Sequence, residues 1–73
     1  MTTRSHNLPL AAMERIMKQV GADRVSEDGK AALRDVLEDT AINISERAMK
    51  FAMHAGRKTI KAEDIKLASK ESG

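Results

Sequence analysis

The chain of 73 residues contains no cysteine, tryptophan or tyrosine and only one phenylalanine, Phe51. Without cysteine, neither a disulfide nor a thiolate metal site can stabilise the fold. Without several aromatic rings, the chain has no surface on which the bases of RNA or single-stranded DNA would stack. A domain of this length has marginal stability unless it has a staple or a partner chain. Association with another chain is therefore the expected source of stability.

Long apolar runs and catalytic residue patterns are also absent. No segment approaches the roughly 20 apolar residues that a membrane-spanning helix needs, and no signal-peptide hydrophobic region is present. We therefore expect an intracellular, cytoplasmic protein. No Ser-His-Asp grouping, glycine-rich phosphate loop or inward-facing carboxylate pair indicates an enzyme or a small-molecule substrate. Since His6 has no companions at metal-ligand spacing, we expect neither a metal nor another cofactor.

The segment from Glu27 to His54 has the apolar period of one long α-helix. Ser26 precedes it as a good N-cap, and Gly56 follows it as a stop signal. About 28 residues make a rod of roughly 42 Å, whereas a compact globule of this chain length has a diameter of about 30 Å. One chain therefore cannot cover its own long helix, and a second copy or a similar chain must do so. The expected dimer core consists of apolar residues of this helix: Leu33, Val36, Leu37, Ile44 and Ala48.

Short helices are expected on both sides of the long one, which gives an all-α fold in the order short, long, short. The first helix opens at Leu8-Pro9, where proline is tolerated in the first turn, and the last begins at Ala62. The expected organisation is a mobile N-terminal tail over residues 1–7, one domain over residues 8–70 and a frayed C-terminus over residues 71–73.

The two connections between these helices combine extended pieces with positive charge. Arg24-Val25 and Thr59-Ile60 are both able to adopt an extended conformation. Arg57, Lys58 and Lys61 place three positive charges within five residues of the second connection, beside the Thr59 hydroxyl. Such a loop suits the phosphates of DNA, although a solvated turn explains these residues equally well when they are taken alone. The first helix and the first connection add further basic residues: Arg15, Lys18 and Arg24.

The stretch from His54 to Ile65, HAGRKTIKAEDI, resembles the second loop and third helix of archaeal histones. Leu8-Pro9 with Arg15-Ile16, and the segment from Gly21 to Ser26, resemble the first helix and first loop of the same family. The resemblance implies a histone fold, in which two chains clasp head-to-tail in a handshake with their long helices crossing. It also implies that the first loop of one chain pairs in parallel with the second loop of its partner through their extended pieces.

The same resemblance implies roles for single residues. Arg15 is similar to an arginine that family members insert into the minor groove of DNA, and its plain alternative is a surface arginine without that role. Arg24 and Thr59 are expected side by side across the two chains. Arg57 is expected to form an internal ion pair with Asp64 that fixes the loop to the last helix.

A contact between dimers is implied as well. His54 resembles the histidine that meets Asp64 of a neighbouring dimer in this family. Phe51 and Leu67 would complete a contact of four helices. The alternative for His54 is a surface position at the C-terminal end of a helix, where positive charge suits the helix dipole.

These observations predict an archaeal-type histone that binds double-stranded DNA with weak sequence preference, wraps it and compacts it in the nucleoid. The chain would act as a homodimer, or as a heterodimer with a related histone, and would form higher assemblies on DNA. The alternative is a histone-fold interaction subunit that pairs with a different partner in a transcription or chromosome complex. The charge of the loop from Arg57 to Lys61 favours DNA, because a module that only pairs with protein need not carry it.

Overall fold

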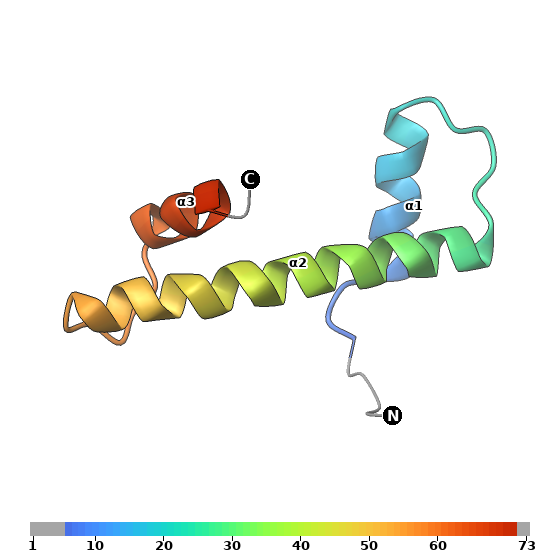
Figure 1. Ribbon diagram of the computed structural model, residues 1–73. Helices are drawn as coiled ribbons and strands as arrows, with labels where there is room; N and C mark the ends of the chain where they lie inside the picture. Colours follow the sequence, from blue (N-terminus) through green and yellow to red (C-terminus); the bar gives the residue numbers. More distant parts are fainter. Residues whose placement is uncertain (1–5, 72–73) are drawn as a thin grey trace. The chain divides into compact units, whose positions relative to one another are not determined.

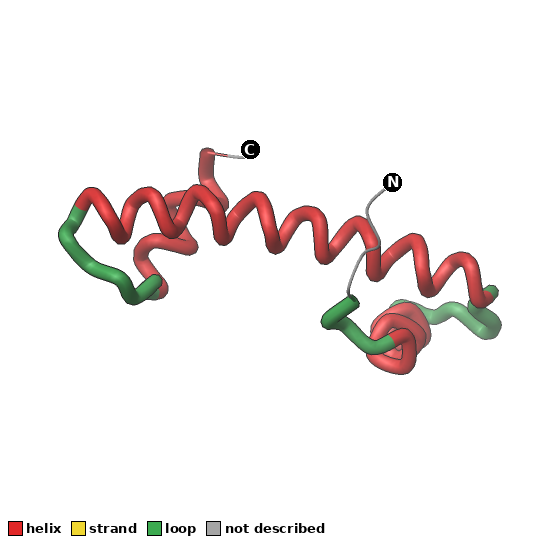
Figure 2. The backbone as a smooth tube through the Cα atoms, turned by 90° about the horizontal axis from the view of Figure 1, so that it is seen from below, coloured by secondary structure: helices red, strands yellow, loops and turns green. Residues whose placement is uncertain are grey.

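The computed structural model describes residues 6–71, which form three α-helices joined by two connections (Figure 1). Figure 2 shows only helices and loops, and no strand occurs between residues 6 and 71. The prediction of an all-α fold with a long central helix is therefore confirmed. Residues 1–5 of the expected tail, and residues 72 and 73 of the expected frayed end, lie outside the described residues. The helices are α1 (Leu10–Gln19), α2 (Glu27–His54) and α3 (Ala62–Glu71).

The residues that flank α2 fix both of its ends. Ser26 Oγ accepts a hydrogen bond of 3.1 Å from the Gly29 amide, which satisfies one of the amides left free in the first turn. At the other end, Gly56 adopts a φ of +72°, a left-handed conformation that glycine reaches at little cost. The Arg57 amide then donates to the Ala52 carbonyl at 2.9 Å and closes the helix. Because both signals are local, α2 has the bounds that the sequence predicts.

The end of α1 follows the same rule, but its beginning does not. Gly21 has a φ of +103°, and the Ala22 amide donates to the Met17 carbonyl at 3.2 Å, which is the same type of helix ending. Pro9 occupies the N-cap position and provides no side-chain hydrogen bond. The helix begins only at Leu10, so the predicted opening at Leu8-Pro9 is two residues too early.

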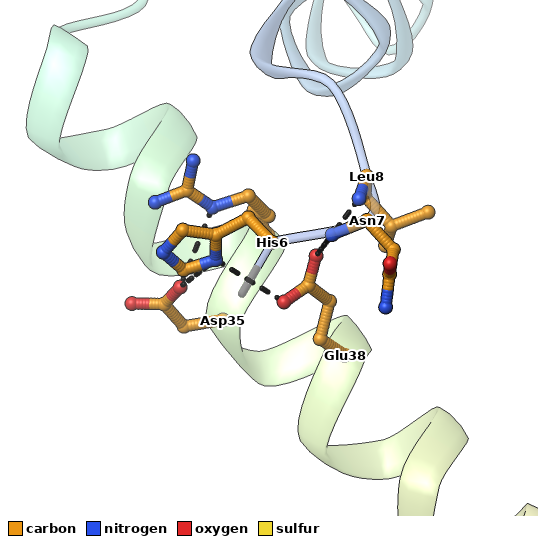
Figure 3. A network of polar contacts seen from close by, with 6 residues as sticks. His6, Asn7, Leu8, Asp35 and Glu38 are labelled. Atoms are coloured by element: carbon orange, nitrogen blue, oxygen red, sulfur yellow. Dashed lines mark hydrogen bonds and ion pairs between the residues drawn. The ribbon is translucent and has the colours of Figure 1, made fainter. Parts of the chain in front are cut away.

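Glu38 of α2 holds the segment that precedes α1 (Figure 3). Its carboxylate accepts hydrogen bonds from the Leu8 amide at 2.8 Å and the Asn7 amide at 2.7 Å, and Nδ1 of His6 lies 3.2 Å from it. Glu38 is only 4% exposed. The bond from Leu8, followed by those from Asn7 and His6, outweighs burial and lowers the pKa of Glu38 from 4.5 to about 2. His6 and Asn7, which belong to the expected tail over residues 1–7, both contact Glu38 of α2. The mobility of the tail stays a prediction.

The chain divides into two compact units, one ending at Asp39 and the other beginning at Thr40. In the first unit, Met13 of α1 is buried. In the second unit, Ala48 and Ala52 of α2 and Ala68 of α3 are completely buried, and their small side chains allow the two helices to pack closely. These four are the buried hydrophobic residues of the described chain. So small a core leaves most of the apolar side chains of α2 without full cover.

The five residues predicted for the dimer core divide into two groups. Val36 and Leu37 are 60% and 36% exposed, and Leu33 and Ile44 are half-buried. These side chains have apolar surface that a partner chain would remove from water. Ala48 differs, because packing within its own chain already buries it completely. The burial of Ala48 therefore requires no second chain.

Candidate nucleic-acid interface

The connection between α2 and α3 is built around the side chain of Arg57. Gly56 turns the backbone away from α2, and the Arg57 guanidinium reaches across the connection to the first turn of α3. Its Nη1 donates to the Thr59 carbonyl at 2.7 Å and to Asp64 Oδ2 at 3.0 Å, while Nη2 donates to Asp64 Oδ1 at 3.1 Å. This two-pronged contact uses the planar shape of the guanidinium, which lysine lacks.

Asp64 is the acceptor at the centre of the connection, and it is only 2% exposed. Besides the two bonds from Arg57, its Oδ2 accepts a bond of 2.7 Å from the Lys61 amide. Lys61 directly precedes α3, so this bond satisfies a free amide at the helix start in the manner of a capping box. The Arg57 guanidinium and the Lys61 amide lower the pKa of Asp64, and Asp64 in turn raises the pKa of Arg57. Arg57 and Asp64 together brace the loop against α3.

The braced connection presents its other polar side chains to solvent. Lys58, Thr59 and Lys61 are exposed, whereas Arg57 is half-buried by its contacts with Asp64 and the loop backbone. Of the three cations predicted to meet DNA here, two are therefore displayed and one is occupied in holding the loop. The arrangement offers two ammonium groups and a hydroxyl on a backbone that need not be ordered when a ligand binds.

The predicted basic residues of the first unit are also exposed, in different surroundings. Arg15 and Lys18 lie on α1, and Arg24 lies on the connection between α1 and α2. The ammonium of Lys18 lies 3.1 Å from Glu14 Oε2, one helical turn away. Exposed pairs of this kind contribute little to stability. Neither extended piece, Arg24-Val25 nor Thr59-Ile60, forms a strand within the single chain.

The residues predicted for contact between dimers belong to the second unit and differ in exposure. His54 is exposed and lines an open hollow with Lys50 and Met53. Leu67 is half exposed and Phe51 is half-buried. Asp64 is the exception, because its buried carboxylate already accepts three hydrogen bonds from its own chain. Oδ1 accepts one of these bonds and Oδ2 accepts the other two.

Two charged residues that sequence reasoning did not single out carry contacts within the first unit. Glu38 holds the backbone before α1, and Lys30 of α2 contacts Glu14 of α1. Both are nearly buried, although glutamate and lysine in a helix are usually exposed. In the sequence, the only sign of this burial is that both residues lie among the apolar positions of the long helix. In the second unit, Nε of Arg47 is buried and has no hydrogen-bond partner within the part of the chain described here.

Other classes of site gain no support from the described residues. Between residues 6 and 71, no three His, Cys, Asp or Glu side chains gather in a way that could hold a metal ion. In the same range, none of the three helices is both long enough and apolar enough to cross a membrane.

Comparison with known proteins identifies the family to which this arrangement of three helices belongs. The family model of histone-like transcription factors (CBF/NF-Y) and archaeal histones matches residues 6–68. The chain belongs to this family. The resemblance to archaeal histones is thereby confirmed, and the short, long and short helices are those of the histone fold.

Three curated relatives match most of the chain. A subunit of the archaeal histone HAN1 of Thermococcus zilligii is 52% identical over 63 residues, which cover 86% of this chain and 94% of the relative. The probable archaeal histone 3 of Methanocaldococcus jannaschii is 44% identical over 61 residues, covering 84% and 91%. The DNA-binding protein HmvA of the same organism is 41% identical over 64 residues, covering 88% of this chain and 67% of that protein.

Proposed function

We propose that this histone-family protein binds double-stranded DNA as a dimer, and wraps and compacts the duplex with weak sequence preference. The observation that carries this proposal is the braced loop, in which Arg57 and Asp64 hold Lys58 and Lys61 toward solvent. A loop already held in one conformation loses little entropy when phosphates bind to its lysines and amides. The name of one relative, the DNA-binding protein HmvA, supports the same activity.

The proposed mechanism is neutralisation of phosphate charge combined with bending of the duplex. Lys58 and Lys61 contact phosphates and release the counterions bound to them. In the dimer, Arg24 of one chain lies beside Thr59 of the other, next to these lysines. Arg15 enters the minor groove, where it responds to groove width and not to base sequence, and Lys18 adds charge on the same helix. In this proposal Arg57 acts mainly on the loop itself. The protein acts in the nucleoid by binding alone, without catalysis.

Dimer formation is supported by the exposed apolar residues of α2. Val36 and Leu37 remain exposed in the single chain, and the described residues bury few large apolar side chains. A second copy of the chain, or a related histone, covers this surface in the proposed handshake. The relative from Thermococcus zilligii is named as one subunit of the archaeal histone HAN1, so a heterodimer should be tested directly beside the homodimer.

Assembly of dimers along DNA is proposed through the end of α2. His54, Phe51 and Leu67 supply the accessible part of this contact. The part taken by Asp64 is limited to its Oδ1, because Arg57 and Lys61 occupy the rest of the carboxylate.

The proposal is tested by anisotropy titrations of labelled duplexes at several salt concentrations, followed by micrococcal nuclease digestion of the complexes. We expect similar affinities for unrelated duplexes of equal length, a steep decrease with salt, and protected fragments of discrete sizes. Absence of duplex binding, together with stable pairing to an unrelated protein, would support the interaction-subunit alternative. Strong preference for one short sequence would also contradict the proposal.

A further inference from the structure

A polar contact ties α1 to α2 in the first unit. Nζ of Lys30 on α2 lies 2.9 Å from Glu14 Oε1 on α1 and 2.7 Å from Oε2 of Glu27, one turn earlier on its own helix. The other oxygen of Glu14, Oε2, lies 3.1 Å from the Lys18 ammonium. Glu14 is thus shared between a lysine of the neighbouring helix and a lysine of its own helix.

The environment of Lys30 makes its contact with Glu14 more than a surface ion pair. Lys30 is only 9% exposed, and a nearly buried ammonium must be compensated by opposite charge and hydrogen bonds. Glu27 and Glu14 provide both, and they raise the pKa of Lys30, while Lys30 and Lys18 lower the pKa of Glu14. Since Glu27 belongs to the same helix as Lys30, only Glu14 links the ammonium to α1.

The position of Glu14 on α1 connects this contact to the proposed DNA surface. Arg15 is the next residue, and successive side chains of an α-helix are about 100° apart around the axis. A carboxylate fixed by Lys30 therefore fixes the rotation of α1 and with it the direction in which exposed Arg15 points. The buried Met13 and the Glu38 contacts before α1 restrain the helix as well, but they lie on the other side of Glu14 in the sequence.

We propose that Glu14 and Lys30 are a positioning pair that sets how Arg15 is presented to the minor groove, and thereby sets the preference of this histone for DNA shape. This inference rests on the proposed function, because it requires that Arg15 contact DNA. It assigns no direct DNA contact to either member of the pair.

The test uses the opposite charges of the two residues. Glu14→Gln removes a negative charge and Lys30→Met removes a positive charge, while both break the link between the helices. A purely electrostatic effect shifts the affinities of the two variants for every duplex in opposite directions, since one substitution increases and the other decreases the attraction to phosphate. It leaves the ratio of affinities for two duplexes of equal length nearly unchanged. A loss of positioning lowers that ratio in both variants. The methionine keeps much of the apolar stem of Lys30 and so limits the loss of packing.

The quantity to measure is the ratio of affinities for two duplexes of equal length at the same salt concentration. One duplex carries flexible TA steps spaced at the helical repeat, and the other lacks them. We expect Glu14→Gln, Lys30→Met and the double variant all to lower this ratio toward the value of Arg15→Ala. The double variant should lose no more than either single variant, because all three break the same link. Lys30→Arg, which can still reach Glu14, should keep the ratio of the wild type.

Glu27→Gln is the matched control, because it removes the same charge as Glu14→Gln beside the same ammonium but leaves α1 untouched. It should keep the wild-type ratio. Thermal melting of each variant at one protein concentration verifies that the variants compared are folded. Should Lys30→Met not fold, Glu14→Gln carries the test with Glu27→Gln as its control. Changes of opposite sign in Glu14→Gln and Lys30→Met, or a wild-type ratio in Glu14→Gln, overturn the inference. If the wild type binds no duplex, or Arg15→Ala keeps the wild-type ratio, the proposed role of Arg15 has failed and the inference falls with it.

Discussion

Arg57 and Lys58 are neighbours with the same charge, yet the structure gives them different tasks, and this difference can be measured. Lys58 is exposed, whereas the Arg57 guanidinium donates to Asp64 and to the Thr59 carbonyl. The perturbation is a pair of variants, Lys58→Gln and Arg57→Gln, each of which removes one positive charge from each chain. If every loop cation contacted phosphate in the same way, the two variants would lose the same amount of salt dependence.

The expected change follows from the number of contacts. Each phosphate contact contributes about 0.9 to the slope of log affinity against log salt, and a dimer displays Lys58 twice, so Lys58→Gln should lower the slope by about 1.8. Over a roughly fourfold increase in salt, the wild type should then lose about ten times more affinity than the variant. Adding Lys61→Gln should lower the slope by about 3.6 in total. Arg57→Gln should change the slope much less, because its guanidinium is already engaged within the loop.

The assay is fluorescence anisotropy with one labelled duplex at several salt concentrations, together with thermal melting of the free protein. Arg57→Gln should lower the melting temperature clearly, because it leaves Asp64 buried without its main partner. Lys58→Gln should leave the melting temperature nearly unchanged, and it serves as the control of equal charge. The reasoning is refuted if both variants show the same loss of slope and neither shows a lower melting temperature.

Three further predictions concern folding. Because α2 exposes Val36 and Leu37 in the single chain, the melting temperature should rise with protein concentration and sedimentation equilibrium should give twice the chain mass; a folded monomer at micromolar concentration would contradict the handshake. Gly56→Ala should destabilise each chain by about 1–2 kcal/mol in urea unfolding, because alanine resists a φ of +72°, and an unchanged midpoint would contradict this. The pKa of Glu38 is lowered from 4.5 to about 2, so its contribution to stability is fully present above pH 4.5 and is lost as the pH falls through about 2. Glu38→Gln should therefore flatten this part of the acid-unfolding curve. An unchanged curve would show that the ionised Glu38 carboxylate does not stabilise the fold.

The sequence predicted α2 well because both of its ends are determined by neighbouring residues. Ser26 and Gly56 lie next to the helix in the chain, and the bonds that they make or permit span only a few residues. The brace between Arg57 and Asp64 was expected from the resemblance to archaeal histones, and it too joins residues that are close in sequence. The beginning of α1 was predicted less well. The amides of Asn7 and Leu8 bond to Glu38, about 30 residues away, and no local pattern marks such a partner.

Glu38 and Lys30 show why the contacts between α1 and α2 were not predicted from the sequence. The apolar period of α2 identifies the residues that avoid water, and charged residues between them are normally assigned to the surface. In this chain, nearly buried charges join α1 to α2: the Glu38 carboxylate binds backbone amides before α1, and Lys30 binds Glu14 within it. Contacts of this kind depend on direction and distance, so they fix the orientation of a ten-residue helix more strictly than apolar contact alone. Val36 and Leu37 of the same helix are exposed. Charged contacts thus hold α1 to α2 within the chain, and the exposed apolar surface of α2 is left for the second chain of the proposed dimer.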